Sequence, residues 1–253
     1  MLKVTAKNAK NQTIQLTQSS SYQLVAISGI DPPVADIATA QLATDDGSEF
    51  NLARVPQRNI VLTIQPIGDV ETTRTGLYPY FTPKSPVTLL IQTGGREVNI
   101  EGIVESFTVD YNANPQLIQV SIICPRPYFN AKNDTTVNIT NVSATANNAG
   151  DVPVGFSIEV TLANTVSNFL VTNQTTSKTI SFEDTPLQSG DVVKINTRTG
   201  QKSATFVHNG VESSLLPYMY LGSDWPTLIS GSNSILISNG TAVLTFTAQY
   251  AGL

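Results

Sequence analysis

Along most of this chain apolar residues alternate with polar ones, and this period of two is the feature that most restricts its fold. Ile60, Leu62 and Ile64 share one side of such a run, and further alternating runs fill residues 156–250, with turn-forming residues between them. Because successive side chains of a strand point to opposite faces, the pattern predicts strands with one buried face. The sequence therefore predicts a mainly β protein whose second half is a β-sandwich.

Charge and cysteine usage exclude several classes of protein. Only 13% of the 253 residues are charged, about half of the usual share, and the net charge is −5. This balance gives no basic footprint for nucleic acid. The single cysteine forms no internal disulfide, no apolar run approaches the roughly 20 residues of a membrane helix, and the first residues lack the apolar core of a signal peptide. We expect a protein made in a cytoplasm, with no membrane insertion.

One segment departs from the β pattern. The stretch DVETTRTGLYPYFTP (residues 69–83) places Val70, Leu77 and Phe81 near helical spacing, with Asp69 as a candidate N-cap. Pro79 limits the helix to two or three turns. We predict one short helix here.

A phase slip interrupts the alternation near Gly102. Val98 and Ile100 begin a strand on one phase, whereas Ile103 and Phe107 follow on the other. A slip of one residue at a glycine is typical of a β-bulge. We therefore predict a bulge at Gly102, with Ile103 on the buried face.

Residues 28–59 carry little core signal for a segment of their length. Long segments of this kind are uncommon in compact domains unless they are functional. Two interpretations remain: a surface loop, or an arm that packs on a neighbouring copy of the chain. The second makes Asp36, Gln41, Phe50 and Arg54 candidate residues of an oligomer interface.

The motif CPRPYF (residues 124–129) lies near the middle of the chain. Cys124 is in phase with an inward strand face, where a small buried thiol is common. Because proline cannot continue a strand ladder, Pro125, Arg126 and Pro127 are predicted to form a hinge between two domains. The predicted domains are 1–131 and 132–253, with residues 242–250 as a candidate strand that returns to the first.

The search for catalytic and metal-binding groups finds few candidates. His208 is the only histidine and is interpreted as a strand-end residue, and no second histidine or cysteine could complete a nucleophilic pair or a zinc site. Asp45 and Asp46 form a weak calcium candidate. Trp225 is either a core or edge residue or a platform that stacks on a sugar. The sequence thus predicts no enzyme, no catalytic residue, no cofactor and no metal.

The order of the motifs resembles the distal tail protein family of long-tailed, non-contractile phages. The motifs that carry the resemblance, in order, are PQRNIVLTI (56–64), TRTGLYPYFTPKSPVTLLI (73–91), IEGIVESF (100–107), QVSIICPRPYF (119–129), GDVVKINTRTGQ (190–201), VHNG (207–210) and DWPTLISGSNSI (224–235). The resemblance implies an N-terminal belt domain that forms a six-subunit ring and a C-terminal galectin-like β-sandwich.

In that family the ring joins the tail tube to the tail-tip baseplate. The resemblance implies a structural virion protein of the tail tip, with further copies of itself, the tail tube protein, a hub or fibre protein and receptor-binding proteins as partners. The alternative is a carbohydrate-binding adhesion module. A galectin sugar site needs several side chains converging on one face, whereas His208, Trp225 and Arg198 lie on separate segments.

Overall fold

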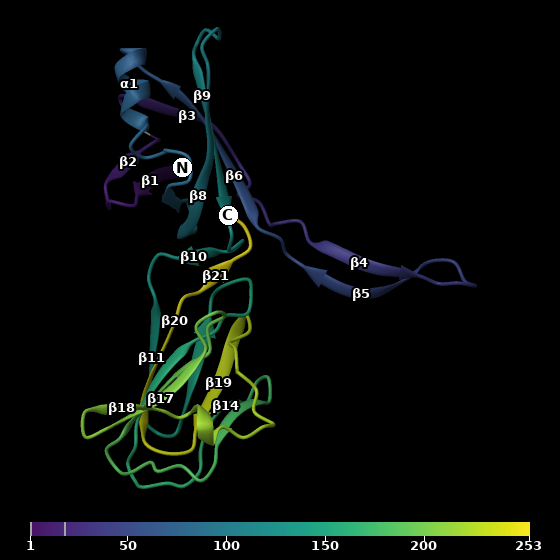
Figure 1. Ribbon diagram of the computed structural model, residues 1–253, viewed down its shortest axis with the longest axis vertical. Coiled ribbons are helices and arrows are strands. Elements are labelled where there is room, and N and C mark those ends of the chain that lie inside the picture. The colour runs from purple at the N-terminus through teal and green to yellow at the C-terminus, as the bar shows by residue number, and fades with distance from the viewer. Residues whose placement is uncertain (1, 18) are drawn as a thin grey trace. The chain divides into compact units, whose positions relative to one another are not determined.

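The computed structural model describes residues 2–17 and 19–253, which form two compact units (Figure 1). One unit spans Met1–Lys132 and Tyr250–Leu253, and the other spans Asn133–Gln249. The chain is mainly β with a single short α-helix among the described residues, as the alternation predicted. None of the helices in this part of the chain is long and apolar enough to cross a membrane.

The first unit is built around one large antiparallel sheet. Its strands follow the order β2-β1-β7-β8-β9-β6-β3, and β10 and β21 join beside β8. Leu16, just after β2, donates its N–H to Val4 of β1 and accepts from Leu24 of β3, so the two ends of this order meet. The elements are β1 (Lys3–Asn8), β2 (Thr13–Gln15), β3 (Tyr22–Ser28), β4 (Asp36–Gln41), β5 (Ser48–Arg54), β6 (Arg58–Pro66), α1 (Val70–Leu77), β7 (Pro86–Gln92), β8 (Glu97–Asp110), β9 (Leu117–Cys124), β10 (Phe129–Ala131) and β21 (Gln249–Tyr250).

The alternation in the sequence sets the core of this unit. Ile60, Leu62 and Ile64 of β6 are fully buried, and they pair with the buried side of β9, which ends at Cys124. Each such aliphatic side chain contributes about 1.5–3 kcal/mol through its burial. The predicted inward position of Cys124 is confirmed.

The phase slip of β8 lies three residues beyond its predicted position. Gly102 keeps the regular register opposite Val87, Val104 is buried, and Ile103 is 47% exposed. The register shifts between Val104 and Ser106. Gly102 faces inward because a Cβ there would lie 2.5 Å from the side chain of Ile122. The prediction of a bulge at Gly102 with Ile103 buried is therefore wrong. Gly102 occupies an inward position, but because glycine has no side chain the apolar pattern of the sequence does not mark that position as buried.

The predicted helix is confirmed as α1. Asp69 precedes it, and its carboxylate accepts a hydrogen bond of 2.6 Å from the Thr72 hydroxyl, which lowers the pKa of Asp69. Leu77, the last residue of the helix, is buried. Arg74 is hydrogen-bonded to Glu71 and, at 2.9 Å, to the hydroxyl of Tyr111 beyond the end of β8. The helix is thus attached to the β8–β9 hairpin by a polar side chain as well as by packing.

The second unit contains two antiparallel sheets, as expected for a sandwich. One has the order β11-β20-β13-β16-β17-β18 and the other the order β12-β19-β14-β15. Their strands are β11 (Thr135–Ile139), β12 (Ser143–Asn148), β13 (Ser157–Thr161), β14 (Phe169–Asn173), β15 (Lys178–Phe182), β16 (Val192–Asn196), β17 (Ser203–His208), β18 (Val211–Ser214), β19 (Gly231–Ile237) and β20 (Thr241–Phe246), with a 3-10 turn at Leu216–Tyr218. Phe156, Phe169, Phe182 and Phe246 are fully buried in its core.

Candidate functional site

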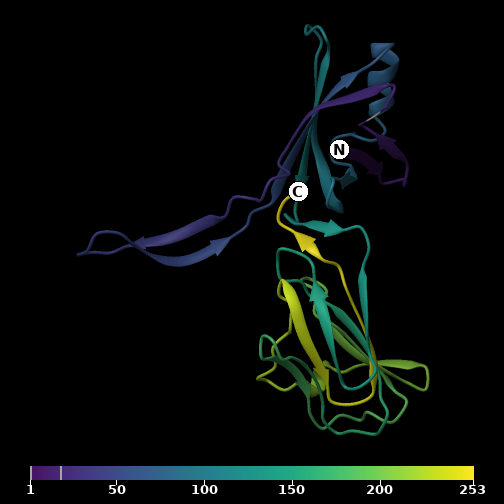
Figure 2. The ribbon, with the colours of Figure 1, turned by 180° about the vertical axis from the view of Figure 1, so that it is seen from behind.

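Residues 36–54 form a hairpin that we call the arm. Within residues 2–17 and 19–253, strands β4 and β5 pair only with each other, and every residue of both strands is exposed. In Figures 1 and 2 the hairpin extends away from the sheet of the first unit. The weak core signal of residues 28–59 therefore has a structural cause, because neither face of the arm is covered by the part of the chain that the structure describes.

Both faces of the arm carry apolar side chains. Ile37 and Phe50 are 64% and 63% exposed, and Leu52 is 60% exposed. The register pairs Ala38 with Leu52 and Thr39 with Phe50, with a shift between them. An isolated two-stranded hairpin is at best marginally stable in water. The arm is thus a surface that would gain stability from a partner.

The four predicted interface residues all lie on this hairpin. Asp36 and Arg54 face each other at its base and form an exposed ion pair of 3.6 Å. Gln41 is paired with Ser48 near the tip, and Phe50 lies beside the register shift. The structure gathers these residues on one element, and their role in an interface stays a prediction.

The residue that fixes the root of the arm is Arg58, which the sequence analysis did not single out. It is 4% exposed, and its guanidinium donates to the carbonyl oxygens of Gly29 and Asp31 before the arm, at 2.6 and 2.8 Å. It also donates to Pro127 at 2.6 Å and to Ala251 at 2.5 Å. Four carbonyls from three backbone segments of the first unit therefore meet on one side chain.

The surroundings of Arg58 are unusual for a buried cation. Its guanidinium lies 4.5 Å from the centre of the Phe129 ring, and its hydrogen-bond acceptors are all neutral carbonyls. Burial lowers the pKa of Arg58, but an arginine stays charged at any ordinary pH. A sequence signal was present, because Arg58 is in phase with the buried Ile60 and Leu62. A charged residue on the inward phase of a strand indicates a buried polar network.

Residues 250–253 are also held close to Arg58 by further contacts. Arg96 donates to the Gly252 carbonyl at 2.5 Å, and its guanidinium lies 4.4 Å from the centre of the Tyr250 ring. The Leu253 N–H donates to Ile30 at 3.1 Å. A Cβ on Gly252 would lie 2.6 Å from Pro32, so these residues pack closely against the start of the arm.

The CPRPYF motif is placed just before the chain leaves the first unit. Cys124 is fully buried at the end of β9, and burial raises the pKa of its thiol to about 11. Pro125 and Arg126 are exposed, whereas the Pro127 carbonyl is held by Arg58. β10 follows, and the first unit ends at Lys132. A hinge function of Pro125, Arg126 and Pro127 stays a prediction.

In the second unit, the three residues considered for a sugar site have separate partners. His208 Nδ1 lies 2.7 Å from a carboxylate oxygen of buried Asp191, a pair that the sequence analysis missed. Arg198 donates to the Thr245 carbonyl at 3.3 Å. Trp225 packs against the core with the Lys202 ammonium 5.6 Å from its ring centre. The structure therefore favours the core or edge interpretation of Trp225.

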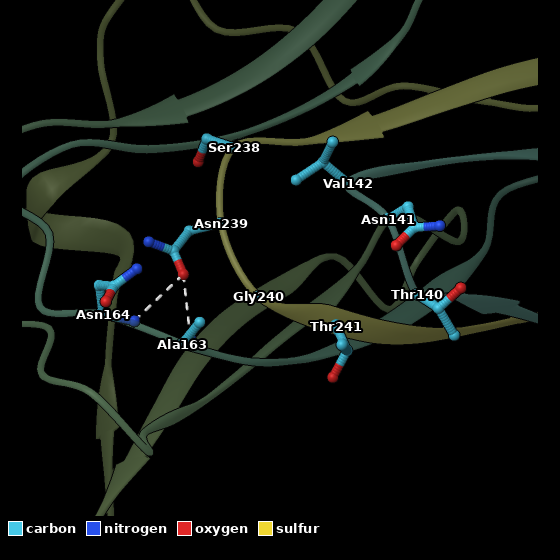
Figure 3. Close-up of a pocket in the computed structure, with 9 residues that line it drawn as sticks. All are labelled: Thr140, Asn141, Val142, Ala163, Asn164, Ser238, Asn239, Gly240 and Thr241. Atoms are coloured by element: carbon cyan, nitrogen blue, oxygen red, sulfur yellow. Dashed lines mark hydrogen bonds between the residues drawn. The ribbon is translucent and has the colours of Figure 1, made fainter.

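A shallow depression of about 550 Å³ lies elsewhere in this unit (Figure 3). The carboxamide oxygen of Asn239 accepts from the N–H groups of Ala163 and Asn164, at 2.9 and 3.3 Å. At its rim Val142 has φ +49°, an uncommon conformation for a β-branched residue. Its lining is uncharged: Thr140, Asn141, Val142, Ala163, Asn164, Ser238, Asn239, Gly240 and Thr241.

A metal centre has no support in the part of the chain that the structure describes. No group of three or more His, Cys, Asp or Glu side chains there could hold an ion. Asp45 and Asp46, the weak calcium candidates, lie in the exposed turn of the arm.

Comparisons with known proteins find phage tail proteins both for the second unit and for the chain as a whole. Residues 149–250 match the family described as siphovirus-type tail component, C-terminal domain. No curated protein matches the chain. Among solved structures, SPP1 Dit (gp 19.1), described as a paradigm of the hub adsorption apparatus in phages that infect Gram-positive bacteria, is similar with a TM-score of 0.73 and 13% identity over 97% of this chain and 98% of that chain.

Chains of the phage p2 baseplate are also similar. In its activated conformation with Ca the TM-score is 0.53, and with Sr it is 0.51, each at 10% identity over the whole of both chains. At these identities the likeness concerns the fold.

Proposed function

We propose that the chain is a member of the siphovirus Dit (distal tail protein) family and a structural hub of a phage tail tip, because residues 149–250 match the C-terminal domain of siphovirus-type tail components and the fold of the whole chain is similar to that of SPP1 Dit. We propose further that six copies form a ring through the first unit. The ring would join the tail tube to the hub, fibre and receptor-binding proteins of the baseplate. In this role the protein positions partners and carries out no reaction.

The observation that carries the ring is the arm. Each copy presents a hairpin with large apolar side chains exposed on both faces. Covering such surfaces with another chain removes apolar area from water, which favours association. Arg58 holds the root of the arm in place, so the surface is presented in a fixed position rather than by a free loop.

The oligomeric state tests this proposal. Size-exclusion chromatography with light scattering should give a mass near six times the 27.1 kDa of one chain. A variant with residues 36–54 replaced by a short Gly-Ser linker should stay folded and fail to form the ring. A native protein that is monomeric at every concentration would refute the ring, and an unchanged ring in the variant would refute the arm as its interface.

The depression of the second unit supports a second candidate, a module that binds host saccharide. Amide and hydroxyl groups such as those of Asn141, Asn164 and Thr241 suit the hydroxyls of a sugar. Titration calorimetry with cell-wall oligosaccharides should then show saturable binding that Asn164→Ala weakens. Binding that is unaffected by this change, or no binding at all, would leave only the structural role.

A further inference from the structure

The arm and the start of the chain carry opposite charges. Within residues 36–54 there are four acidic residues, Asp36, Asp45, Asp46 and Glu49, against one basic residue, Arg54. Residues 1–30 contain three lysines and no acidic residue. Since the whole chain carries few charges, this separation is a distinct feature of the first unit.

Two of the three lysines lie on one face of β1. Val4 and Ala6 point into the core, so Lys3 and Lys7 share the outward face, and Lys10 follows in the exposed turn. Lys3 and Lys7 are about 13 Å apart along the strand. Among the described residues, no ion pair involves these three lysines. They form a basic stripe, which we call the lysine face.

The lysine face also has an apolar centre. Thr5, between the two lysines, is paired with Leu90 of β7, which is half-buried. Across the next strand pair, Glu101 of β8 lies opposite Thr88 and Glu97 lies opposite Gln92, so the acidic groups on that side are two strands away from the lysines. A leucine flanked by lysines is suited to a partner that offers an apolar residue and carboxylates.

One face of the arm offers this combination. Ala38 and Ala40 of β4 are paired with Leu52 and Glu49 of β5, so these four side chains share a face. The two alanines permit close approach of another sheet surface. Asp45 and Asp46 continue the acidic character into the turn.

We propose that the arm of one copy docks on the lysine face of a neighbouring copy. Leu52 lies against Leu90, and Glu49, Asp45 and Asp46 face Lys3, Lys7 and Lys10. This inference rests on the proposed ring and adds the acceptor surface to it. Because exposed charge pairs are screened by salt, the assembly should weaken as the ionic strength rises.

A charge-reversal experiment tests the pairing in the full-length protein. Lys3→Glu with Lys7→Glu, and Asp45→Lys with Asp46→Lys, should each raise the concentration of half-assembly at least tenfold in light scattering. Combining all four changes should restore assembly to within about threefold of the native value, because the charges again have opposite signs. Lys178→Glu with Lys202→Glu, two exposed lysines of the second unit, is the matched control and should assemble normally. Thermal unfolding followed by circular dichroism confirms that each variant is folded.

The outcomes separate this inference from the proposed function. If the lysine variant assembles like the native protein, or the combined variant is no better than either pair alone, the lysine face is not the acceptor. If in addition the arm replacement abolishes the ring, the hub proposal stands and only the docking site is wrong. A native protein without any ring refutes both.

Discussion

Arg58 is a single side chain that holds several distant parts of the backbone together. A guanidinium presents five N–H donors in a planar fork, whereas a lysine ammonium is a compact point charge. Arg58 uses its fork to satisfy four carbonyls from three separate segments. Buried carbonyls that lose their donor cost free energy, because they are no longer paired with water either.

We therefore expect Arg58→Lys to lower the free energy of unfolding by roughly 2–4 kcal/mol. Urea unfolding followed by far-ultraviolet circular dichroism would measure the change in the free energy of unfolding. Arg54→Lys on the exposed arm is the matched control and should change stability by less than about 0.5 kcal/mol. Equal stabilities of the two variants would show that the carbonyl network contributes little.

A second prediction at this scale concerns the Cys124 thiol. Its pKa is raised to about 11 in the folded protein, above the roughly 8.5 of a free cysteine. At alkaline pH the unfolded chain loses this proton first, so stability is fully present below pH 8.5 and falls as pH rises through 11. The difference in unfolding free energy between native protein and Cys124→Ala should shrink over this window. A pH-independent difference would mean that the thiol is solvated in the folded state.

At the scale of elements, strand positions could be predicted wherever one face is buried. The runs at residues 60–65 and 118–124 show their inward phase because Ile, Leu and Val mark it. The arm could not be predicted as a hairpin, since alternation disappears when both faces are exposed. The position of the register shift in β8 was predicted wrongly for a related reason. Gly102 lies on the inward face, and without a side chain it does not appear in the apolar pattern.

Gly102→Ala tests that interpretation of β8. An added Cβ would meet Ile122 at 2.5 Å and the Cys124 sulfur at 2.9 Å. Overpacking of this kind typically costs about 1–3 kcal/mol, and we expect a loss of that size in chemical denaturation. Gly94→Ala, in the open turn between β7 and β8, should be nearly neutral. A neutral Gly102→Ala would indicate that the strand can shift without cost.

For the whole molecule, the sequence offered residues 242–250 as a strand that returns to the first unit, whereas the structure places Thr241–Phe246 in a sheet of the second unit and only Tyr250–Leu253 in the first. A segment of four residues has no period to detect, and its place depends on Arg96 and on contacts with Ile30 and Pro32. The same limit applies to the candidate site. The arm was suspected from its lack of core signal, whereas the Arg58 network depends on tertiary contacts between distant segments.

We predict that residues 133–249 fold alone as a monomer. This fragment contains two sheets and a complete aromatic core, so it can bury apolar area without the other unit. Dispersed amide signals in an NMR spectrum and a monomer mass would be the expected result. A collapsed spectrum would indicate that the fragment needs residues outside it, and oligomers of the fragment would place an interface on the wrong unit.

Each chain has one arm, and the lysine face proposed as its docking site is a different surface of the chain. A contact of this kind is heterologous, because a donor patch on one copy meets a different patch on the next. Repetition of a heterologous contact leads to a closed ring or to an open helical filament, and the rotation per step decides between them. Arg58 binds the carbonyls of Gly29 and Asp31 just before the arm, so we expect a loosened root to change that rotation. Electron microscopy of Arg58 variants could then show short filaments in place of rings.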